Sequence, residues 1–282
     1  MKPSNRLLPD AFGSARLLEK IYPAAVSFSV AIAFIFATVA WTGDGVANAA
    51  EIKVLSANVF TGVLDDLAHD FERTTGHKVT IVYGTAGAIR NRVQGGEFGD
   101  ITILTRPMLD EVVRQGRVAP GSTVDLARSA VGVAVRKGAP RPDISSVDAF
   151  KRSLLAAKSV SYPDPARGGA TGVLFTRLIE RLGLEDEIKS KTRIPPPGQF
   201  AVVLVARGEA EIAISQPMEV LGQPGVELVG LLPSQLQDPP NFIFSAGLLV
   251  VAKEPEPARA LIQFLCGPAA ASVLKAKGMN PG

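Results

Sequence analysis

Short strands and amphipathic helices alternate along residues 51–282, and this alternation most strongly constrains the fold. Residues 51–57 are rich in β-forming residues, whereas residues 61–75 place apolar side chains at helical spacing before Gly76. Further strands are expected at 79–83, 100–104, 130–136, 159–162, 211–215 and 242–251, and further helices at 88–93, 107–115, 145–156, 171–182, 257–265 and 269–277. Residues 200–207 fit either a helix or a strand. The alternation predicts an α/β protein with mostly parallel sheets flanked by helices.

The elements form two successive sets, which predicts two α/β lobes with a cleft between them. Lobe one is expected to hold residues 50–132 and 243–282, and lobe two residues 133–242. Segments near Val131–Arg136 and Phe242–Leu248 are expected to cross between the lobes as a hinge. Because ligands of open α/β sheets bind beyond the carboxyl ends of the strands, a site is expected at the strand-to-helix turns.

Residues 1–49 differ from the rest of the chain and are expected to be a signal peptide. Most of the charged residues in 1–23 are basic, residues 24–41 include no charged residue, and small residues precede Ala49. This order is typical of a secretory signal that is cleaved after Ala49 or Ala50. The apolar run is also near the lower length limit of a membrane-spanning helix, so a retained anchor is the alternative. Both interpretations predict an exported, periplasmic protein.

The chain lacks the residues that most catalytic and metal sites need. It has one Cys and two His, and it contains neither G-x-S-x-G nor G-x-x-x-x-G-K-[ST]. The net charge is +3 for the chain and +2 without residues 1–49, where four basic and three acidic residues lie. So small an excess predicts no nucleic-acid partner. We therefore expect a binding protein that is not an enzyme and has no metal or cofactor.

Three strand-to-helix turns, at residues 56–61, 83–88 and 164–172, are lined with small residues. Small residues allow a ligand to approach the backbone closely, and the first amides of a helix favour negative charge. Three such helix ends that converge would form an anion site. Any one turn taken alone could serve only to cap its helix, so the prediction depends on all three together.

Charged and amide side chains near these turns are candidates for direct ligand contacts. Arg167 lies inside the third turn and could meet a carboxylate or oxyanion with two parallel hydrogen bonds. Arg106, after the strand at 100–104, has a similar position, and either arginine could instead be an ordinary surface residue. The full set of candidate ligand-binding residues is Asn58, Val59, Thr85, Ala86, Gly87, Arg167, Ala170, Thr171, Gln199 and Gln216.

Five segments form a specific combination that spans nearly all of residues 50–282. They are IKVLSANVFTGVLDDLAHDF, YGTAGAIRNRVQGGEFGDITIL, DPARGGATGVLFTRLIERLG, RGEAEIAIS and ARALIQFLCGPAAASVLKAKGM. Together they resemble the periplasmic substrate-binding components of ABC importers with the type II binding-protein fold, in particular the molybdate-binding group. The resemblance implies a monomer that closes over a small anion by hinge motion and delivers it to an ABC permease in the inner membrane.

The resemblance also implies a site in which main-chain amides and hydroxyls hold a tetrahedral oxyanion without a counter-charge. By position, the two first-lobe serines of the family fall at Val59 and Ala86, and its tyrosine falls at Gln216. None of these three residues has a hydroxyl. The amides that bind the anion fall at Ala170 and near Gly198 or Gln199.

Two ligand classes follow from this comparison of positions. The main expectation is a molybdate-like oxyanion, held by the amides of the helix N-termini. Arg167, Gln199 and Gln216 supply directional donors that favour, as the alternative, an organic carboxylate in the same receptor fold. A membrane-anchored sensory binding protein is a further alternative.

Overall fold

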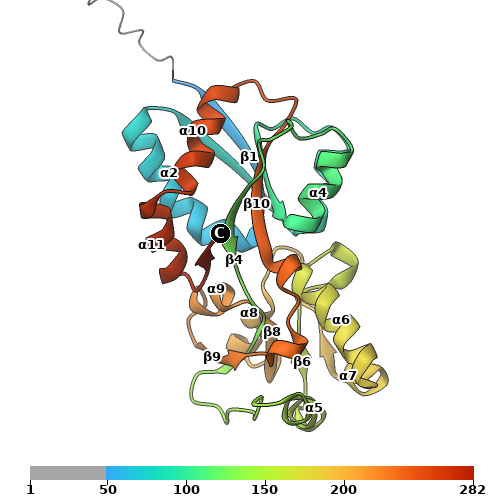
Figure 1. The fold of residues 1–282 in the computed structure, drawn as a ribbon. Helices are drawn as coiled ribbons and strands as arrows, with labels where there is room; N and C mark the ends of the chain where they lie inside the picture. The colour runs from blue at the N-terminus through green and yellow to red at the C-terminus, as the bar shows by residue number, and fades with distance from the viewer. Residues whose placement is uncertain (1–48) are drawn as a thin grey trace, which may run out of the picture. The chain divides into compact units, whose positions relative to one another are not determined.

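The computed structural model describes residues 49–282, so nearly all of the expected signal peptide lies outside the described residues. The described chain forms two α/β lobes, each built on its own sheet (Figure 1). Lobe one consists of the six-stranded sheet, with the strand order β11-β4-β10-β3-β1-β2, and the helices that pack on it. Lobe two consists of the five-stranded sheet, with the strand order β7-β6-β8-β5-β9, and its helices. The expectation of a two-lobed α/β protein is confirmed.

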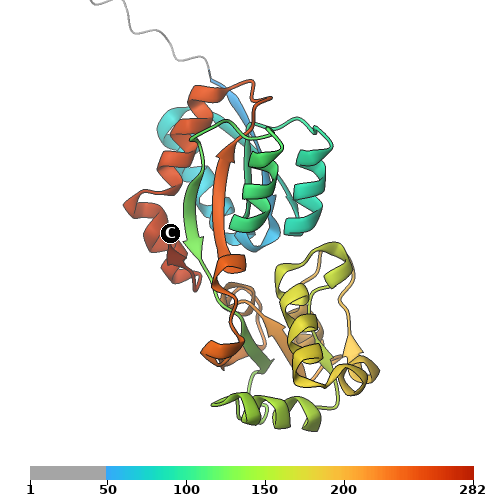
Figure 2. The same cartoon turned by 45° about the vertical axis from the view of Figure 1, so that its right-hand side comes forward.

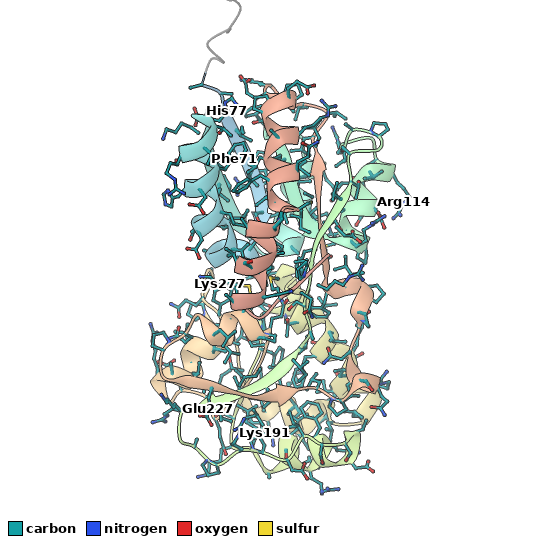
Figure 3. The ribbon with its side chains drawn as sticks, turned by 60° about the vertical axis from the view of Figure 1, so that its left-hand side comes forward. Phe71, His77, Arg114, Lys191, Glu227 and Lys277 are labelled. Atoms are coloured by element: carbon teal, nitrogen blue, oxygen red, sulfur yellow. The ribbon has the colours of Figure 1, made fainter. Side chains whose placement is uncertain are left out.

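Lobe one is assembled from two separate parts of the chain. Its strands are β1 (Glu51–Ala57), β2 (Lys78–Gly84), β3 (Ile101–Thr105), β4 (Val124–Arg128), β10 (Ile243–Leu248) and β11 (Asn280–Pro281). Its helices are η1 (Asn58–Phe60), α2 (Thr61–Thr75), α3 (Ala86–Gln94), α4 (Arg106–Arg114), α10 (Pro255–Leu265) and α11 (Pro268–Ala276). Helices α2, α10 and α11 cover one face of the sheet, and α3 and α4 cover the other (Figures 1 and 2). Lys277, at the end of α11, lies 3.0 Å from the carboxylate of Asp66 on α2 (Figure 3).

Lobe two is one continuous stretch of chain. Its strands are β5 (Gly132–Arg136), β6 (Val160–Ser161), β7 (Thr192–Arg193), β8 (Ile212–Ser215) and β9 (Val226–Leu231). Its helices are α5 (Val147–Ala156), η2 (Pro165–Arg167), α6 (Ala170–Leu182), α7 (Glu185–Lys191), α8 (Ala201–Arg207) and α9 (Pro217–Leu221), and η3 (Ser234–Leu236) and η4 (Pro239–Phe242) follow β9. Helices α5, α6 and α7 pack one hydrophobic core, and α8 packs a second, smaller one. The ambiguous residues 200–207 are therefore mainly helical, since the apolar side chains of α8 face that core.

The sheets are mixed, and the expectation of mostly parallel strands is wrong in this detail. Strands β1, β2 and β3 run parallel, as do β6, β7 and β8, because a helix connects each strand to the next. Strand β10 runs antiparallel to β3 and β4, and β5 runs antiparallel to β8 and β9. These antiparallel strands are those through which the chain leaves one lobe and enters the other.

The chain crosses between the sheets at residues 129–131 and 232–242, which share only Val131 and Phe242 with the segments expected to form the hinge. The expected hinge segments were apolar stretches, and most of their residues form the regular strands β5 and β10. Gln237 joins the two crossings: its Nε2 donates to the Val131 carbonyl at 2.8 Å and to the Leu232 carbonyl at 3.1 Å. Its Oε1 accepts from the Val131 amide at 3.0 Å. The strands of each sheet fall inside the expected lobe ranges except for Gly132, the first residue of β5, and the lobe boundaries themselves stay a prediction.

Within residues 49–282, no single helix has the length and apolar character needed to cross a membrane. Helices α10 and α11 meet those two criteria only as a pair, and they are bent by 57° relative to each other. Both helices bury apolar side chains in the lobe-one core, including Leu261, Ile262 and Leu274.

Candidate functional site

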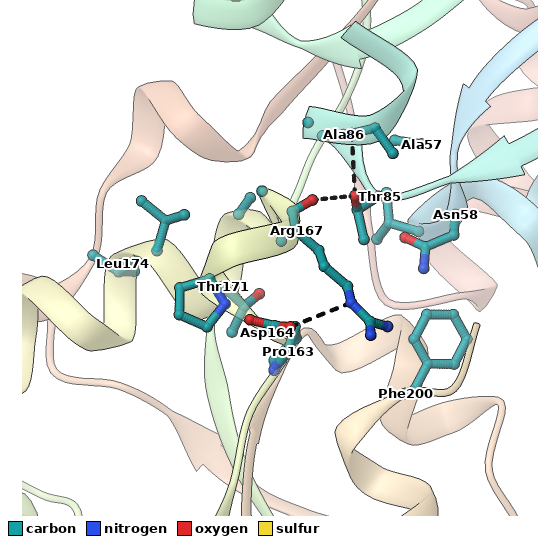
Figure 4. A pocket seen from close by; sticks show the side chains of 18 of the residues that line it. Ala57, Asn58, Thr85, Ala86, Pro163, Asp164, Arg167, Thr171, Leu174 and Phe200 are labelled. Carbon is teal, nitrogen blue, oxygen red and sulfur yellow. Dashed lines mark hydrogen bonds and ion pairs between the residues drawn. The ribbon is translucent and has the colours of Figure 1, made fainter. Parts of the chain in front are cut away.

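A cavity of about 700 Å³ lies between the lobes at the ends of the strands (Figure 4). All ten residues predicted to bind a ligand line this cavity. The three small-residue turns therefore do converge: the turns after β1 and β2 lie at one edge of the six-stranded sheet, and the turn after β6 faces them from the five-stranded sheet. The two walls differ in how their polar groups are hydrogen-bonded.

The wall of the cavity in lobe two contains the N-terminus of α6. Gly169 precedes the helix, and among the described residues no side chain caps its first amides, which include those of Ala170 and Thr171. Thr171 is 1% exposed, and its hydroxyl has no hydrogen-bond partner within residues 49–282. A Cβ on Gly172 would overlap the Pro163 carbonyl oxygen, so glycine is needed there to hold the turn against the helix. Uncapped amides and the helix dipole make this end attractive to an anion.

Two glutamines add further unpaired oxygens to the same wall. Gln216, at the end of β8, is 4% exposed, and Gln199 follows Pro195–Pro197. The Oε1 atom of each is buried and has no hydrogen-bond partner in the described part of the chain. Because leaving a buried polar atom unpaired costs about 1–3 kcal/mol, each of these acceptor oxygens needs a donor, which a hydroxyl of a bound ligand would supply and a carboxylate would not.

Arg167 provides a positive charge within the cavity. Its side chain is 44% exposed, and Nε lies 3.3 Å from the carboxylate of Asp164. Asp164 also accepts a hydrogen bond from the Ala166 amide at 2.9 Å, which fixes the short helix η2. The guanidinium points into the space between Asn58 and Phe200 (Figure 4). Its remaining N–H groups are in position to donate to a carboxylate or oxyanion.

Glu219 is a cavity residue that the sequence interpretation missed. It lies on α9 and is 6% exposed, and its Oε2 accepts hydrogen bonds from the Ser215 hydroxyl and, at 3.2 Å, from the Gln216 amide. Burial raises the pKa of the Glu219 carboxyl above its ordinary value. The only sequence signal was the spacing of three residues between Gln216 and Glu219, which fits a helix cap as well as a site.

In the wall in lobe one, Thr85 and Gly87 are already engaged in hydrogen bonds. The Thr85 hydroxyl accepts from the Ala88 amide at 3.2 Å and donates to the Arg167 carbonyl. The Gly87 amide, expected to bind an anion, donates to the Gly168 carbonyl at 3.2 Å. Val59 and Ala86 present buried apolar side chains, and the side chain of Asn58 points toward the guanidinium of Arg167 (Figure 4).

Other charged residues divide into those at the cavity and those away from it. Arg106 lies outside the set of residues that line the cavity, and it pairs instead with Asp110 at 2.9 Å and Asp125 at 3.0 Å. The lining residues not singled out from the sequence include Arg90, Arg177, Phe200, Asp238 and Asn241. Within residues 49–282, no group of three His, Cys, Asp or Glu side chains is close enough together to hold a metal ion.

Comparison with known proteins places these features in context. The family model for bacterial extracellular solute-binding proteins matches residues 52–280. An aconitate isomerase from Pseudomonas sp. is 37% identical over 236 residues, which cover 82% of this chain and 87% of that protein. The molybdate-binding protein ModA from Azotobacter vinelandii is 29% identical over 239 residues, which cover 82% of this chain and 90% of that protein.

The solved structures that match have the same fold. The periplasmic molybdate-binding protein from Azotobacter vinelandii superimposes with a TM-score of 0.68 at 21% identity, covering 81% of this chain and 98% of that chain. The sulfate-binding protein SubI from Mycobacterium tuberculosis superimposes with a TM-score of 0.65 at 15% identity, covering 82% of this chain and 87% of that chain. These likenesses establish the type II binding-protein architecture of the two lobes.

Proposed function

The chain belongs to the bacterial extracellular solute-binding proteins, and on this premise we propose that it binds a small organic acid with two or more carboxylates in its interlobe cavity. The observation that carries the proposal is the presence of two separate anion-binding groups at one cavity. One is the uncapped N-terminus of α6 with the unpaired Thr171 hydroxyl, and the other is the Arg167 guanidinium. Two carboxylates on one molecule would engage both groups at once.

The size and chemistry of the cavity favour an organic acid over a molybdate-like oxyanion. About 700 Å³ falls in the range of sites that bind small organic molecules, about 300–1,000 Å³. Val59, Ala86 and Gln216 stand where the molybdate-binding group has hydroxyls, so the shell for a tetrahedral oxyanion would be incomplete. The 37% identity to an aconitate isomerase supports an organic acid, because aconitate is an unsaturated tricarboxylate.

Calorimetric titration of the purified protein tests this proposal. We expect trans-aconitate, cis-aconitate or citrate to bind, and molybdate and sulfate to give no heat of binding at the same concentrations. Molybdate binding at micromolar or tighter affinity, without binding of any organic acid, would overturn the proposal and support the oxyanion instead.

Isomerisation of a bound unsaturated acid is a second candidate function, and the buried Glu219 favours it. Moving a carbon–carbon double bond by one position requires a group that removes a proton from one end of the allyl unit and returns it to the other. The reaction consumes no oxidant and no water. Glu219 is a buried carboxyl at the cavity with a raised pKa, as expected of a proton-transfer group.

Proton NMR of trans- and cis-aconitate in deuterated water tests for turnover. An isomerase would interconvert the two acids, and Glu219→Gln would abolish interconversion while binding is retained. A protein that binds the acids but leaves their spectra unchanged over many hours would be a receptor only. The expectation that the protein is not an enzyme would then stand.

We further propose that the protein acts in the periplasm as a monomer and, as a receptor, hands its ligand to an ABC permease. A small ligand is the partner expected of its family. N-terminal sequencing of the exported protein would identify cleavage after Ala49 or Ala50. A retained N-terminus would favour the membrane-anchored sensory alternative. Light scattering of the purified protein would give its oligomeric state.

A further inference from the structure

The two lobes touch where the N-terminus of α3 meets the turn that follows η2. The Gly87 amide donates to the Gly168 carbonyl at 3.2 Å. Beside it, the Thr85 hydroxyl donates to the Arg167 carbonyl across 82 residues of sequence (Figure 4). Both hydrogen bonds run from lobe one to the backbone of the turn that carries Arg167.

The approach of the two backbones is closer than any side chain would allow. A Cβ added to Gly87 would lie 2.8 Å from the Gly168 Cα, and one added to Gly168 would lie 2.7 Å from the Gly87 Cα. Non-bonded carbon atoms prefer about 3.5–4.0 Å. Because the obstructing atoms are backbone atoms, they cannot rotate away as a side chain could. This contact therefore requires glycine at both positions.

The conformation of Gly87 gives no local reason for a glycine. It is the second residue of α3, where the helical backbone suits any L-residue and glycine is disfavoured relative to alanine. Gly168 differs, since its φ of +70° by itself favours glycine. The contact between the lobes is thus the structural feature that accounts for a glycine at residue 87.

We propose that Thr85, Gly87 and Gly168 form an interlobe latch that holds the cleft closed and positions Arg167 for the ligand. The latch fixes the Arg167 backbone to lobe one, while Asp164 tethers its guanidinium within lobe two. The part of the proposal that concerns Arg167 rests on the proposed binding function. The part that concerns closure does not depend on which acid binds. Gly87, Gly168 and Thr85 are positioning residues in this account.

Gly87→Ala tests the latch, and Gly62→Ala is its matched control. Gly62 is also the second residue of a helix in lobe one, but a Cβ there would lie 3.6 Å from the Lys277 Nζ, an ordinary contact. Alanine suits both helices, so neither variant is expected to lower the melting temperature. We expect Gly87→Ala to weaken trans-aconitate binding on the order of tenfold or more, and Gly62→Ala to leave it within about twofold.

Closure is measured separately by electron–electron distance measurements between spin labels on Lys78→Cys in lobe one and Lys158→Cys in lobe two, with Cys266→Ser in the background. In the wild-type and Gly62→Ala backgrounds, we expect a fraction of the molecules to show the label distance of the closed form, and this closed fraction should grow when trans-aconitate is added. In the Gly87→Ala background the closed fraction should be lost. An equal closed fraction in both variants would overturn the latch. So would a wild type without a closed population in either condition.

Thr85 provides an independent check through its hydroxyl. Thr85→Ser keeps both hydrogen bonds and should behave as the wild type does, whereas Thr85→Val removes both and should shift the label distances as Gly87→Ala does. If trans-aconitate fails to bind the wild type but the closed fraction without ligand is still lower in Gly87→Ala than in Gly62→Ala, the latch stands and the proposed ligand fails. If trans-aconitate binds and the closed fraction is the same in both variants, the latch fails and the proposed binding function stands.

Discussion

The two walls of the cavity differ in the hydrogen bonding of their polar groups. In lobe one, the Thr85 hydroxyl and the Gly87 amide are already bonded, and both bonds reach the other lobe. In lobe two, Thr171 and Gln216 hold buried oxygens without a partner in the described residues. Satisfied groups stabilise the closed arrangement, whereas unpaired buried groups favour any ligand that pairs with them. We therefore propose that lobe two supplies most of the ligand contacts and lobe one supplies closure.

Replacing Arg167 should produce the largest loss of affinity. A hydrogen bond to a charged group is worth about 1.5–3 kcal/mol, so Arg167→Met should weaken organic-acid binding by roughly tenfold to a hundredfold. Arg106→Met is the matched control, because Arg106 pairs with Asp110 and Asp125 and does not line the cavity. Calorimetric titration of both variants measures the difference. Equal losses in the two variants would mean that Arg167 acts only through the net charge.

Removing an unpaired oxygen from lobe two should weaken binding without weakening the fold. Thr171→Val keeps the shape of the side chain and removes a buried hydroxyl that has no partner in the described residues. Affinity for the acid should fall on the order of tenfold, while the free energy of unfolding should stay the same or increase. Titration together with urea unfolding tests both effects. A destabilised protein would show that the hydroxyl has a structural partner and would contradict this view of the wall.

The pH dependence of stability should reveal the buried Glu219 carboxyl. Its raised folded-state pKa means that the folded protein keeps this proton to higher pH than the unfolded chain, whose glutamates titrate near 4.5. The associated stability is full below that value and is lost as the pH rises through the folded-state pKa. Glu219→Gln cannot ionise, so its free energy of unfolding relative to wild type should increase as the pH rises from 4.5. A constant difference across pH would show that the pKa of Glu219 is the same in the folded and unfolded states, which would contradict the effect of burial.

A change in the lobe-one wall that leaves the latch intact should have the smallest effect. Asn58→Ala removes an amide that points toward Arg167 but leaves Thr85, Gly87 and Gly168 in place (Figure 4). We expect affinity to fall by about threefold to tenfold, in line with about 0.5–1.5 kcal/mol for one neutral hydrogen bond. The same titrations rank this variant against Thr171→Val. A larger loss for Asn58→Ala would reverse the assignment of roles to the two walls.

Much of the site could be predicted because it depends on local pattern. The turns at Asn58, Thr85 and Ala170 each follow a strand, and strands of one sheet that run in the same direction end at the same edge. That rule groups the lobe-one candidates at one sheet edge and the lobe-two candidates at another, and the meeting of the two lobes then places all ten at one cavity. Residue types fixed the candidates within each turn, since small residues and amide donors suit close contact with an anion.

The remaining features depend on how the two lobes meet, which no local pattern encodes. The bond between Thr85 and Arg167 and the contact between Gly87 and Gly168 join segments about 80 residues apart. Alternation of strands and helices likewise could not indicate that β10 returns antiparallel from the other lobe. Glu219 was missed because a buried carboxyl at capping-box spacing looks the same in sequence whether or not a cavity lies beside it.

A crystal structure of the protein with trans-aconitate would test the division between the walls most directly. The account predicts one carboxylate within hydrogen-bond distance of the Thr171 hydroxyl and the α6 amides, and another on the Arg167 guanidinium. The bonds from Thr85 and Gly87 to the other lobe should be retained. A ligand bound by the Thr85 hydroxyl and the Gly87 amide, with the Thr171 hydroxyl still unpaired, would contradict it.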